Sequence, residues 1–300
     1  MVEIFSPGKL MLTSEYFAID GALVLAVPTK LGQEFFFEEQ NDGKSLVFWE
    51  AYHQNKIWLK VIINYETWQI IETNNSSNAE FILKTLKNVQ QLSDKKFTFT
   101  DTYLLKTNLQ FPSDFGFGSS STLMNNLSVW ADVDPFQLNT LSLGGSGYDI
   151  AVAKEQSAIL YQNKPEIQYK KVIFDPEFKN QLIFIHLNQK QDSREGINLY
   201  KSRTKSQELV DEFSKLTHDI LLCSELYYFS HLMTIHEQKI SQFLNIPTVK
   251  EKLFQDCPVF VKSLGAWGGD FVMSAKFRGF KDYFRGKGFT TIFEWNDIIN

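Results

Sequence analysis

The chain has 300 residues, of which 43% are hydrophobic and 22% are charged, and its formal net charge is −5. It is long enough for two globular domains, and we expect one domain over residues 1–170 and a second over residues 171–300. The sequence has no long run of Lys and Arg, which argues against nucleic acid as a partner, because phosphate neutralisation needs clustered basic side chains. The apolar runs are too short to span a bilayer, so we also expect no membrane partner.

The chain contains two cysteines, Cys223 and Cys257, and their spacing is unlike that of a metal site. Free thiols in a reducing compartment are the favoured interpretation. The first residues lack the pattern of a secretion signal, and we therefore expect a cytoplasmic protein. The five histidines form no recognisable metal-binding pair, so a structural zinc is not expected.

The first hundred residues are predicted to be mainly strands. A strand over residues 2–5 should end at a turn formed by Pro7 and Gly8, which places Lys9 directly after the turn. A buried strand is expected over residues 22–27. The next predicted elements are strands over residues 33–39, 45–51 and 56–64, a turn at 41–43 and a helix over 78–92.

The most informative stretch is Pro112 to Thr122, which is rich in Gly and Ser. It follows an alternating run over residues 103–111, typical of a strand, and precedes apolar residues at helical spacing. A glycine turn that opens a helix lets the backbone approach a bound group, and the helix N-terminus favours an anion there. The stretch predicts a phosphate-binding loop, although in isolation a Ser-capped helix after a glycine turn explains it equally well.

A second glycine-rich segment, residues 143–151, places Asp149 at a predicted helix start. An isolated Asp there would only interact favourably with the helix dipole. The three preceding glycines suggest in addition that the backbone packs closely against another group. Beyond it we expect a hairpin over residues 164–174, a strand over 181–187, a long helical segment over 206–243 with or without a break, shorter helices over 249–255 and 281–287, and a final strand over 290–295.

Two loops in the second half carry further candidates. The polar loop after residue 187 could hold an anion through Lys190, Ser193 and Arg194, although a solvated loop is the favoured interpretation. Residues 263–270 form a glycine-rich loop that contains Trp267, ends in Asp270 and leads into a strand. The chain has neither the P-loop pattern nor a dinucleotide-binding pattern.

Three motifs in this order resemble the GHMP kinases, the family of galactokinase, homoserine kinase, mevalonate kinase and phosphomevalonate kinase. The segments that carry the resemblance are residues 6–9 with Glu15 and Tyr16, residues 112–122, and residues 263–270. The resemblance spans nearly the whole chain. The amino acids of the motifs are most similar to those of the mevalonate and phosphomevalonate kinase branch.

The resemblance implies an α+β fold of two domains. An N-terminal α/β domain with a left-handed βαβ unit would carry the first two motifs, and a ferredoxin-like C-terminal domain would carry the third, with ATP and substrate in the cleft between them. It also implies transfer of the γ-phosphoryl group of ATP to mevalonate or phosphomevalonate, in the synthesis of isoprenoid precursors. ATP and Mg²⁺ would be the cofactors, and the protein would be a monomer or a homodimer.

The same resemblance implies roles for individual residues. Lys9 would neutralise charge on the transferred phosphoryl group and keep Asp149 ionised, and Asp149 would accept or orient the substrate proton. The ATP phosphates would contact Pro112, Gly116, Phe117, Gly118, Ser119, Ser120 and Ser121, with Ser120 oriented to Mg²⁺. The substrate would contact Glu15, Tyr16, Ser146, Gly147, Lys190, Ser193, Gly265, Ala266 and Gly268.

The sequence departs from the family pattern at several positions. Phe117 replaces a usual Leu, and Trp267 replaces a glycine, where it could narrow the pocket or stack on a ligand. Mevalonate kinases have a magnesium-binding Glu before the Asp motif, but this chain has no Glu between Thr122 and Asp149. Asp132, Asp134 or water are the possible substitutes.

Two alternative functions follow from these departures. One is a non-catalytic protein that binds a nucleotide or metabolite on the same fold. The other is a diphosphomevalonate decarboxylase, a branch whose phosphorylating Asp lies in the last motif region, where this chain has Asp270.

Overall fold

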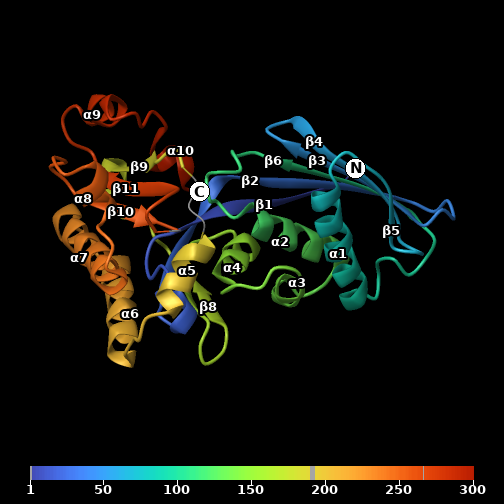
Figure 1. Cartoon of the computed structure of the whole chain (residues 1–300), viewed down its shortest axis with the longest axis horizontal. Coiled ribbons are helices and arrows are strands. Elements are labelled where there is room, and N and C mark those ends of the chain that lie inside the picture. The colour runs from blue at the N-terminus through green and yellow to red at the C-terminus, as the bar shows by residue number, and fades with distance from the viewer. Residues whose placement is uncertain (1, 190–192, 266) are drawn as a thin grey trace. The chain divides into compact units, whose positions relative to one another are not determined.

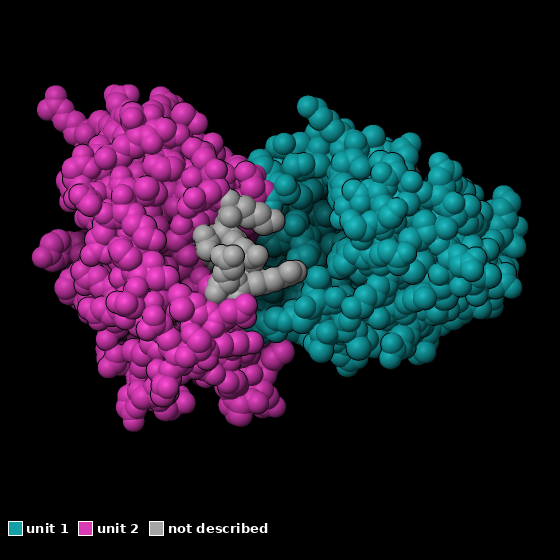
Figure 2. Space-filling model, in the orientation of Figure 1, with its two compact units in different colours: residues 1–8, 31–113, 117–156 teal, residues 9–30, 114–116, 157–300 magenta. Residues whose placement is uncertain are grey.

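The computed structural model describes residues 2–189, 193–265 and 267–300, and it has a mixed α+β fold (Figure 1). Two compact units divide the chain (Figure 2). Unit 1 comprises residues 1–8, 31–113 and 117–156, and unit 2 comprises residues 9–30, 114–116 and 157–300. The chain enters each unit more than once, and the domain boundary that we expected near residue 170 remains a prediction.

Unit 1 is a sheet covered on one side by helices (Figure 1). Its strand order is β5-β4-β3-β6-β2, in which β3 and β6 run parallel and the other pairs run antiparallel. The strands are β1 (Val2–Met11), β2 (Val24–Gln40), β3 (Leu46–His53), β4 (Lys56–Asn64), β5 (Gln69–Thr73) and β6 (Thr102–Leu109), of which β1 and β2 continue into unit 2. The helices are α1 (Ser76–Leu92), α2 (Ser119–Ala131), α3 (Pro135–Ser142) and α4 (Tyr148–Glu155).

Alternation along the strands explains why one face of this sheet is covered. In β3, Val47, Trp49 and Ala51 are buried, whereas Phe48 between them is 36% exposed. The buried set packs with aromatic residues of the neighbouring strands and of α2 in one core. Side chains two apart in a strand share a face, so this pattern fixes which face receives the helices.

Unit 2 contains a four-stranded antiparallel sheet of order β10-β11-β9-β12. Its strands are β9 (Leu182–His186), β10 (Val261–Leu264), β11 (Phe271–Ala275) and β12 (Ile292–Glu294), and β7 (Ile159–Gln162) and β8 (Gln168–Lys171) pair beside the first part of β2. The α-helices are α5 (Ser193–Lys201), α6 (Gln207–Leu221), α7 (Leu226–Leu244), α8 (Val249–Leu253), α9 (Phe280–Gly286) and α10 (Trp295–Ile298), and short 3₁₀ turns span Phe17–Asp20 and Lys179–Gln181. The order of strands and helices from β9 to β12 is that of a ferredoxin-like unit.

Several predicted boundaries were wrong. The turn expected at Pro7 and Gly8 does not form, because β1 runs through both residues and pairs with β2 as an added strand, where a missing proline N–H is tolerated. The strands expected over 22–27 and 33–39 are one strand, β2. The hairpin expected over 164–174 lies earlier, as β7 and β8.

Two elements were missed and one was left open. Helix α3 has the Asp134 side chain as its N-cap and Pro135 in its first turn, a recognisable helix start that the predicted elements did not include. Strand β5 was also missed. The long helical segment after residue 206 is broken into α6 and α7.

Both cysteines are free thiols, as predicted. Within the described residues, no helix combines the length and the apolar character needed to cross a bilayer.

A glycine in β2 provides a test of the packing in unit 1. A Cβ at Gly32 would lie 2.2 Å from the Ser6 carbonyl oxygen and 2.6 Å from the Phe5 ring. We expect Gly32→Ala to lower the free energy of unfolding by about 1–3 kcal/mol through overpacking, as measured by urea denaturation. Gly286→Ala is the matched control, because a Cβ there meets nothing within 4 Å. An unchanged stability of Gly32→Ala would contradict the packing.

Candidate active site

The predicted phosphate-binding loop connects β6 to α2. Gly116 and Gly118 have φ angles of +67° and +81°, a left-handed conformation that glycine adopts at little cost. Gly118 is the N-cap of α2, and no side chain caps this helix end. The first turn of α2 therefore presents N–H groups that no side chain caps, an arrangement that suits an anion, and anion binding there stays a prediction.

Asp149 is tied to this helix within unit 1. It lies in the first turn of α4, after Gly147, whose φ is +85°. The Ser121 hydroxyl, in the first turn of α2, donates a hydrogen bond to Asp149 Oδ2, while Asp149 Oδ1 accepts from the Ile150 N–H at 3.1 Å. The Ser121 hydroxyl thus binds the carboxylate beside the loop, and its predicted contact with phosphate stays a prediction.

Lys9 reaches the same loop within unit 2. It belongs to β1, and its Nζ donates a hydrogen bond of 2.9 Å to the Gly116 carbonyl oxygen. The ammonium group is partly buried, so it is better placed than a solvated surface lysine to neutralise an anion at the loop.

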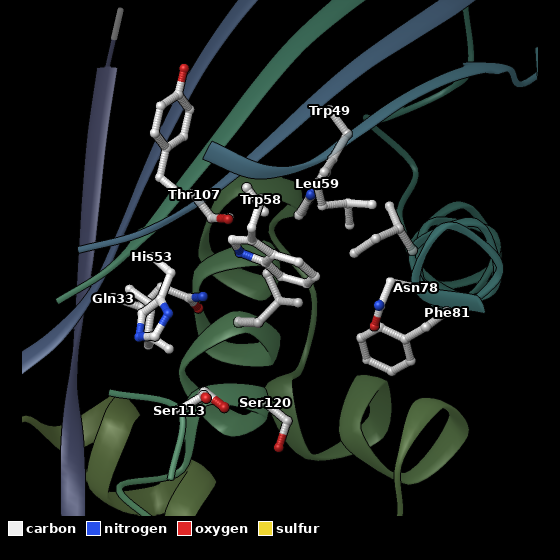
Figure 3. Close-up of a pocket in the computed structure, with 16 residues that line it drawn as sticks. Gln33, Trp49, His53, Trp58, Leu59, Asn78, Phe81, Thr107, Ser113 and Ser120 are labelled. Carbon is white, nitrogen blue, oxygen red and sulfur yellow. The ribbon is translucent and has the colours of Figure 1, made fainter. Parts of the chain in front are cut away.

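A pocket of about 460 Å³ opens beside the start of α2, entirely within unit 1. Ser113 and Ser120 lie at one end, and Trp58 and Phe81 present aromatic rings farther along it (Figure 3). Ser119 also lines the pocket. The polar groups of Gln33, His53, Asn78 and Thr107 also line it. This combination suits a ligand that joins a planar apolar ring to an anionic group.

Glu15, predicted as a substrate contact, lies in a buried ionic cluster of unit 2. Its Oε1 lies 2.5 Å from Lys262 Nζ, and Lys262 lies 3.5 Å from a carboxylate oxygen of Glu237. Glu15 and Lys262 are both 0% exposed. Sequence reasoning missed Lys262, although a lysine between Val261 and Ser263 in an apolar strand was a visible signal.

Burial sets the protonation preferences in this cluster. Desolvation raises the pKa of Glu15 to about 7, against the opposing effect of Lys262. Desolvation also holds the pKa of His236 well below its usual value, with Lys262 adding to the effect. Neutral His236 accepts a 2.7 Å hydrogen bond from the Ser14 N–H at Nε2. Lys262 thus lies close to two buried carboxylates, those of Glu15 and Glu237.

Trp267 and Tyr16 are anchored next to this cluster. Trp267 is 4% exposed, and its indole N–H donates to Glu237 at 2.8 Å, so the ring is fixed by the protein itself. Tyr16 stacks on Tyr200, and its hydroxyl lies against Gly196, where a Cβ would be only 2.0 Å away. Burial, followed by the charge of Glu15, raises the pKa of Tyr16 to about 12.

The remaining candidates are placed as follows. Ser146 and Gly147 precede α4, Pro112 follows β6, Phe117 is fully buried, and Ser193 is the first residue of α5. Gly265 and Gly268 adopt φ angles of +70° and +94° in the loop between β10 and β11. Lys190 and Ala266 lie outside the described residues.

The acids considered as magnesium ligands have other partners. Asp132 pairs with Lys95 on the surface, and Asp134 caps α3 by accepting from the Gln137 N–H. Among the described residues, no cluster of three or more His, Cys, Asp or Glu side chains is arranged to hold a metal ion. The Ser120 hydroxyl in the first turn of α2 is a hard oxygen donor of the kind that Mg²⁺ accepts, and a nucleotide would have to supply most of the other ligands.

Proteins of known structure share this fold. No family model matches the chain, and no curated protein matches it by sequence. Phosphomevalonate kinase of Streptococcus pneumoniae, solved with phosphomevalonate and AMPPNP, superposes with a TM-score of 0.71 at 14% identity over 98% of this chain and 100% of that chain. Mevalonate kinase of Methanococcus jannaschii superposes with a TM-score of 0.69 at 17% identity, over 97% and 96% of the two chains.

A sugar kinase has the same fold. Galactokinase of Lactococcus lactis, complexed with galactose, gives a TM-score of 0.64 at 13% identity over 95% of this chain and 88% of that chain. All three are GHMP kinases. The chain therefore has the GHMP kinase fold over nearly its entire length.

The buried cluster predicts an unusual pH dependence. Because the folded state raises the pKa of Glu15 from 4.5 to about 7, its contribution to stability is fully present below pH 4.5 and is lost as the pH rises towards 7. We expect Glu15→Gln to remove this loss, which can reach about 1.4 kcal/mol per pH unit for one proton. The measurement is the free energy of unfolding in urea, compared between pH 5 and pH 7.5. The control is Glu72→Gln, at an exposed position, and parallel pH profiles of Glu15→Gln and wild type would contradict the assignment.

Proposed function

We propose that this protein is an ATP-dependent kinase of the GHMP type that phosphorylates a small molecule. The observation that carries the proposal is that Lys9 and Asp149, far apart in the sequence, are each hydrogen-bonded to the loop and helix start that would bind the phosphates. Phosphoryl transfer needs positioning and charge neutralisation more than covalent participation of the protein, and these two groups are suited to those tasks.

In the proposed reaction, Asp149 accepts the proton of the attacking acceptor oxygen. That oxygen forms a bond to the γ-phosphorus of ATP, the bond from this phosphorus to the bridging oxygen breaks, and ADP leaves. The Ser121 hydroxyl holds the Asp149 carboxylate in orientation, and Lys9 neutralises charge on the transferred group. Mg²⁺ bound with the nucleotide would supply further neutralisation, with Ser120 as its protein ligand.

The pocket of unit 1 supports ATP as the donor. Its aromatic end would hold the adenine ring between apolar side chains, and its serine end lies at the uncapped start of α2. Adenine stacks well on aromatic rings, and phosphates favour a helix N-terminus.

We further propose mevalonate or phosphomevalonate as the acceptor, which would place the protein in isoprenoid-precursor synthesis. Support comes from the amino-acid sequences of the three motifs. It also comes from the two superposed kinases whose names contain these substrates. A screen of ADP release with mevalonate, phosphomevalonate and sugars tests the acceptor. Transfer only to a sugar would overturn this part of the proposal and leave the kinase activity intact.

A decarboxylase is a second candidate, because the acid of the last motif, Asp270, lies against Gly116 of the phosphate loop. Release of CO₂ from diphosphomevalonate in the presence of ATP distinguishes it from the kinase.

Loss of either charged group should slow phosphoryl transfer while ATP still binds. We expect Lys9→Met and Asp149→Asn each to lower kcat by about 10²–10³-fold, because each removes stabilisation of developing charge. Kinetics coupled to ADP release give kcat, and equilibrium binding gives the nucleotide affinity. Lys44→Met, which removes an exposed surface lysine, is the control and should retain full activity. Unchanged turnover in both site variants would exclude the proposed mechanism.

The base-binding role of the pocket has its own test. Trp58 is 46% exposed and lines the pocket, whereas its neighbour Ile57, 41% exposed, is not among the residues that line it. Base stacking is worth about 1–3 kcal/mol, so we expect Trp58→Ala to raise the KM for ATP about tenfold or more with little change in kcat. Ile57→Ala should leave both constants unchanged. Equal KM values in the two variants would place the base elsewhere.

A further inference from the structure

Asp270, which ends the third motif, has an unusual conformation for a non-glycine residue. Its φ is +50°, in the left-handed region, and it is only 7% exposed. Its backbone is held from both sides within unit 2, because its N–H donates to the Gln189 carbonyl at 3.1 Å and its carbonyl accepts from the Leu187 N–H at 2.8 Å. Strained backbone that the surroundings hold in place is concentrated at functional sites.

The Asp270 carboxylate packs directly on the phosphate loop. A Cβ at Gly116 would lie 2.3 Å from Asp270 Oδ2, so the carboxylate occupies the space that a side chain would need. The Gly116 carbonyl oxygen accepts the hydrogen bond from Lys9 Nζ at 2.9 Å. The carboxylate and the ammonium group therefore both contact the same glycine, and all three residues belong to unit 2.

This arrangement has an electrostatic consequence. A carboxylate held out of water is costly unless a positive charge compensates it, and Lys9 brings such a charge to the glycine on which the carboxylate packs. A lysine side chain loses substantial rotamer entropy when it is fixed. A carboxylate fixed close to the ammonium group would offset part of that loss and limit the directions in which the group can point.

We propose that Asp270 is the positioning residue that holds the Lys9 ammonium over the phosphate loop. The catalytic part of this inference rests on the proposed kinase function, whereas the charge coupling does not. The two acids of the site then have separate tasks. Asp149, oriented by Ser121, accepts the proton, and Asp270 keeps the cation in place while nucleotide enters and leaves.

A thermal double-mutant cycle tests the coupling without reference to activity. Lys9→Met removes a positive charge from the glycine on which the Asp270 carboxylate packs, and we expect the Tm to fall by about 3 °C or more. Asp270→Asn removes the charge and keeps a residue that tolerates the left-handed φ. Added to Lys9→Met, it should recover at least half of the loss, because the two effects are not independent.

The control cycle pairs Lys9→Met with Asp256→Asn. Asp256 is an exposed acid that pairs with Lys287, so its effect should simply add to that of Lys9→Met. Strict additivity of Lys9→Met and Asp270→Asn would overturn the proposal. If Lys9→Met fails to fold alone, recovery of a folded protein by Asp270→Asn supports the coupling, and failure of the double variant as well overturns it.

Kinetics separate this inference from the function on which it builds. We expect Asp270→Asn to lower kcat about tenfold or more with a smaller change in the KM for ATP, and Asp270→Glu to restore part of the rate. Phosphoryl transfer without thermal coupling would reject the role of Asp270 and leave the kinase intact. Thermal coupling in a protein that transfers no phosphoryl group would support the charge pairing and reject the kinase function.

Discussion

The site depends on a backbone constraint at Gly116. This residue must turn left-handed, must lack a side chain because the Asp270 carboxylate fills that space, and must present its carbonyl oxygen to Lys9. Only glycine satisfies the first two conditions at little cost. The loop then continues through Gly118 into α2, whose N-terminus is not capped by a side chain, an arrangement that favours an anion.

A different principle organises the interior of unit 2. Glu15, Lys262 and Glu237 form a buried ionic cluster that joins the first motif to the start of the third, and Trp267 extends it through its indole N–H. Buried ion pairs contribute little net stability, because desolvation offsets the attraction, but removing one partner is costly. The cluster therefore keeps Glu15 and Trp267 in one arrangement, so that both residues belong to the framework of unit 2.

The sequence predicted most of what depends on local pattern. The glycine turn before α2, the helix itself and the helix start at Asp149 were all located, because glycine, serine and apolar spacing encode them directly. The contact of Lys9 with Gly116 was not predicted, since it depends on how β1 and the loop pack together. The role of Glu15 was obscured in the same way, because its partner, Lys262, lies near the other end of the chain and belongs to no motif.

The distribution of the chain between the two units has a consequence for biosynthesis. Residues 9–30 belong to unit 2, whose remaining chain, apart from residues 114–116, begins only at residue 157. In β2, Val24, Leu25 and Ala26 pair with residues 159–161 of β7, so these backbone groups cannot form their pairing until all of unit 1 has been translated. A truncated transcript that ends near residue 156 would encode every residue of unit 1 but leave an early strand segment without its pairing partner, which is the kind of exposed edge that chaperones bind.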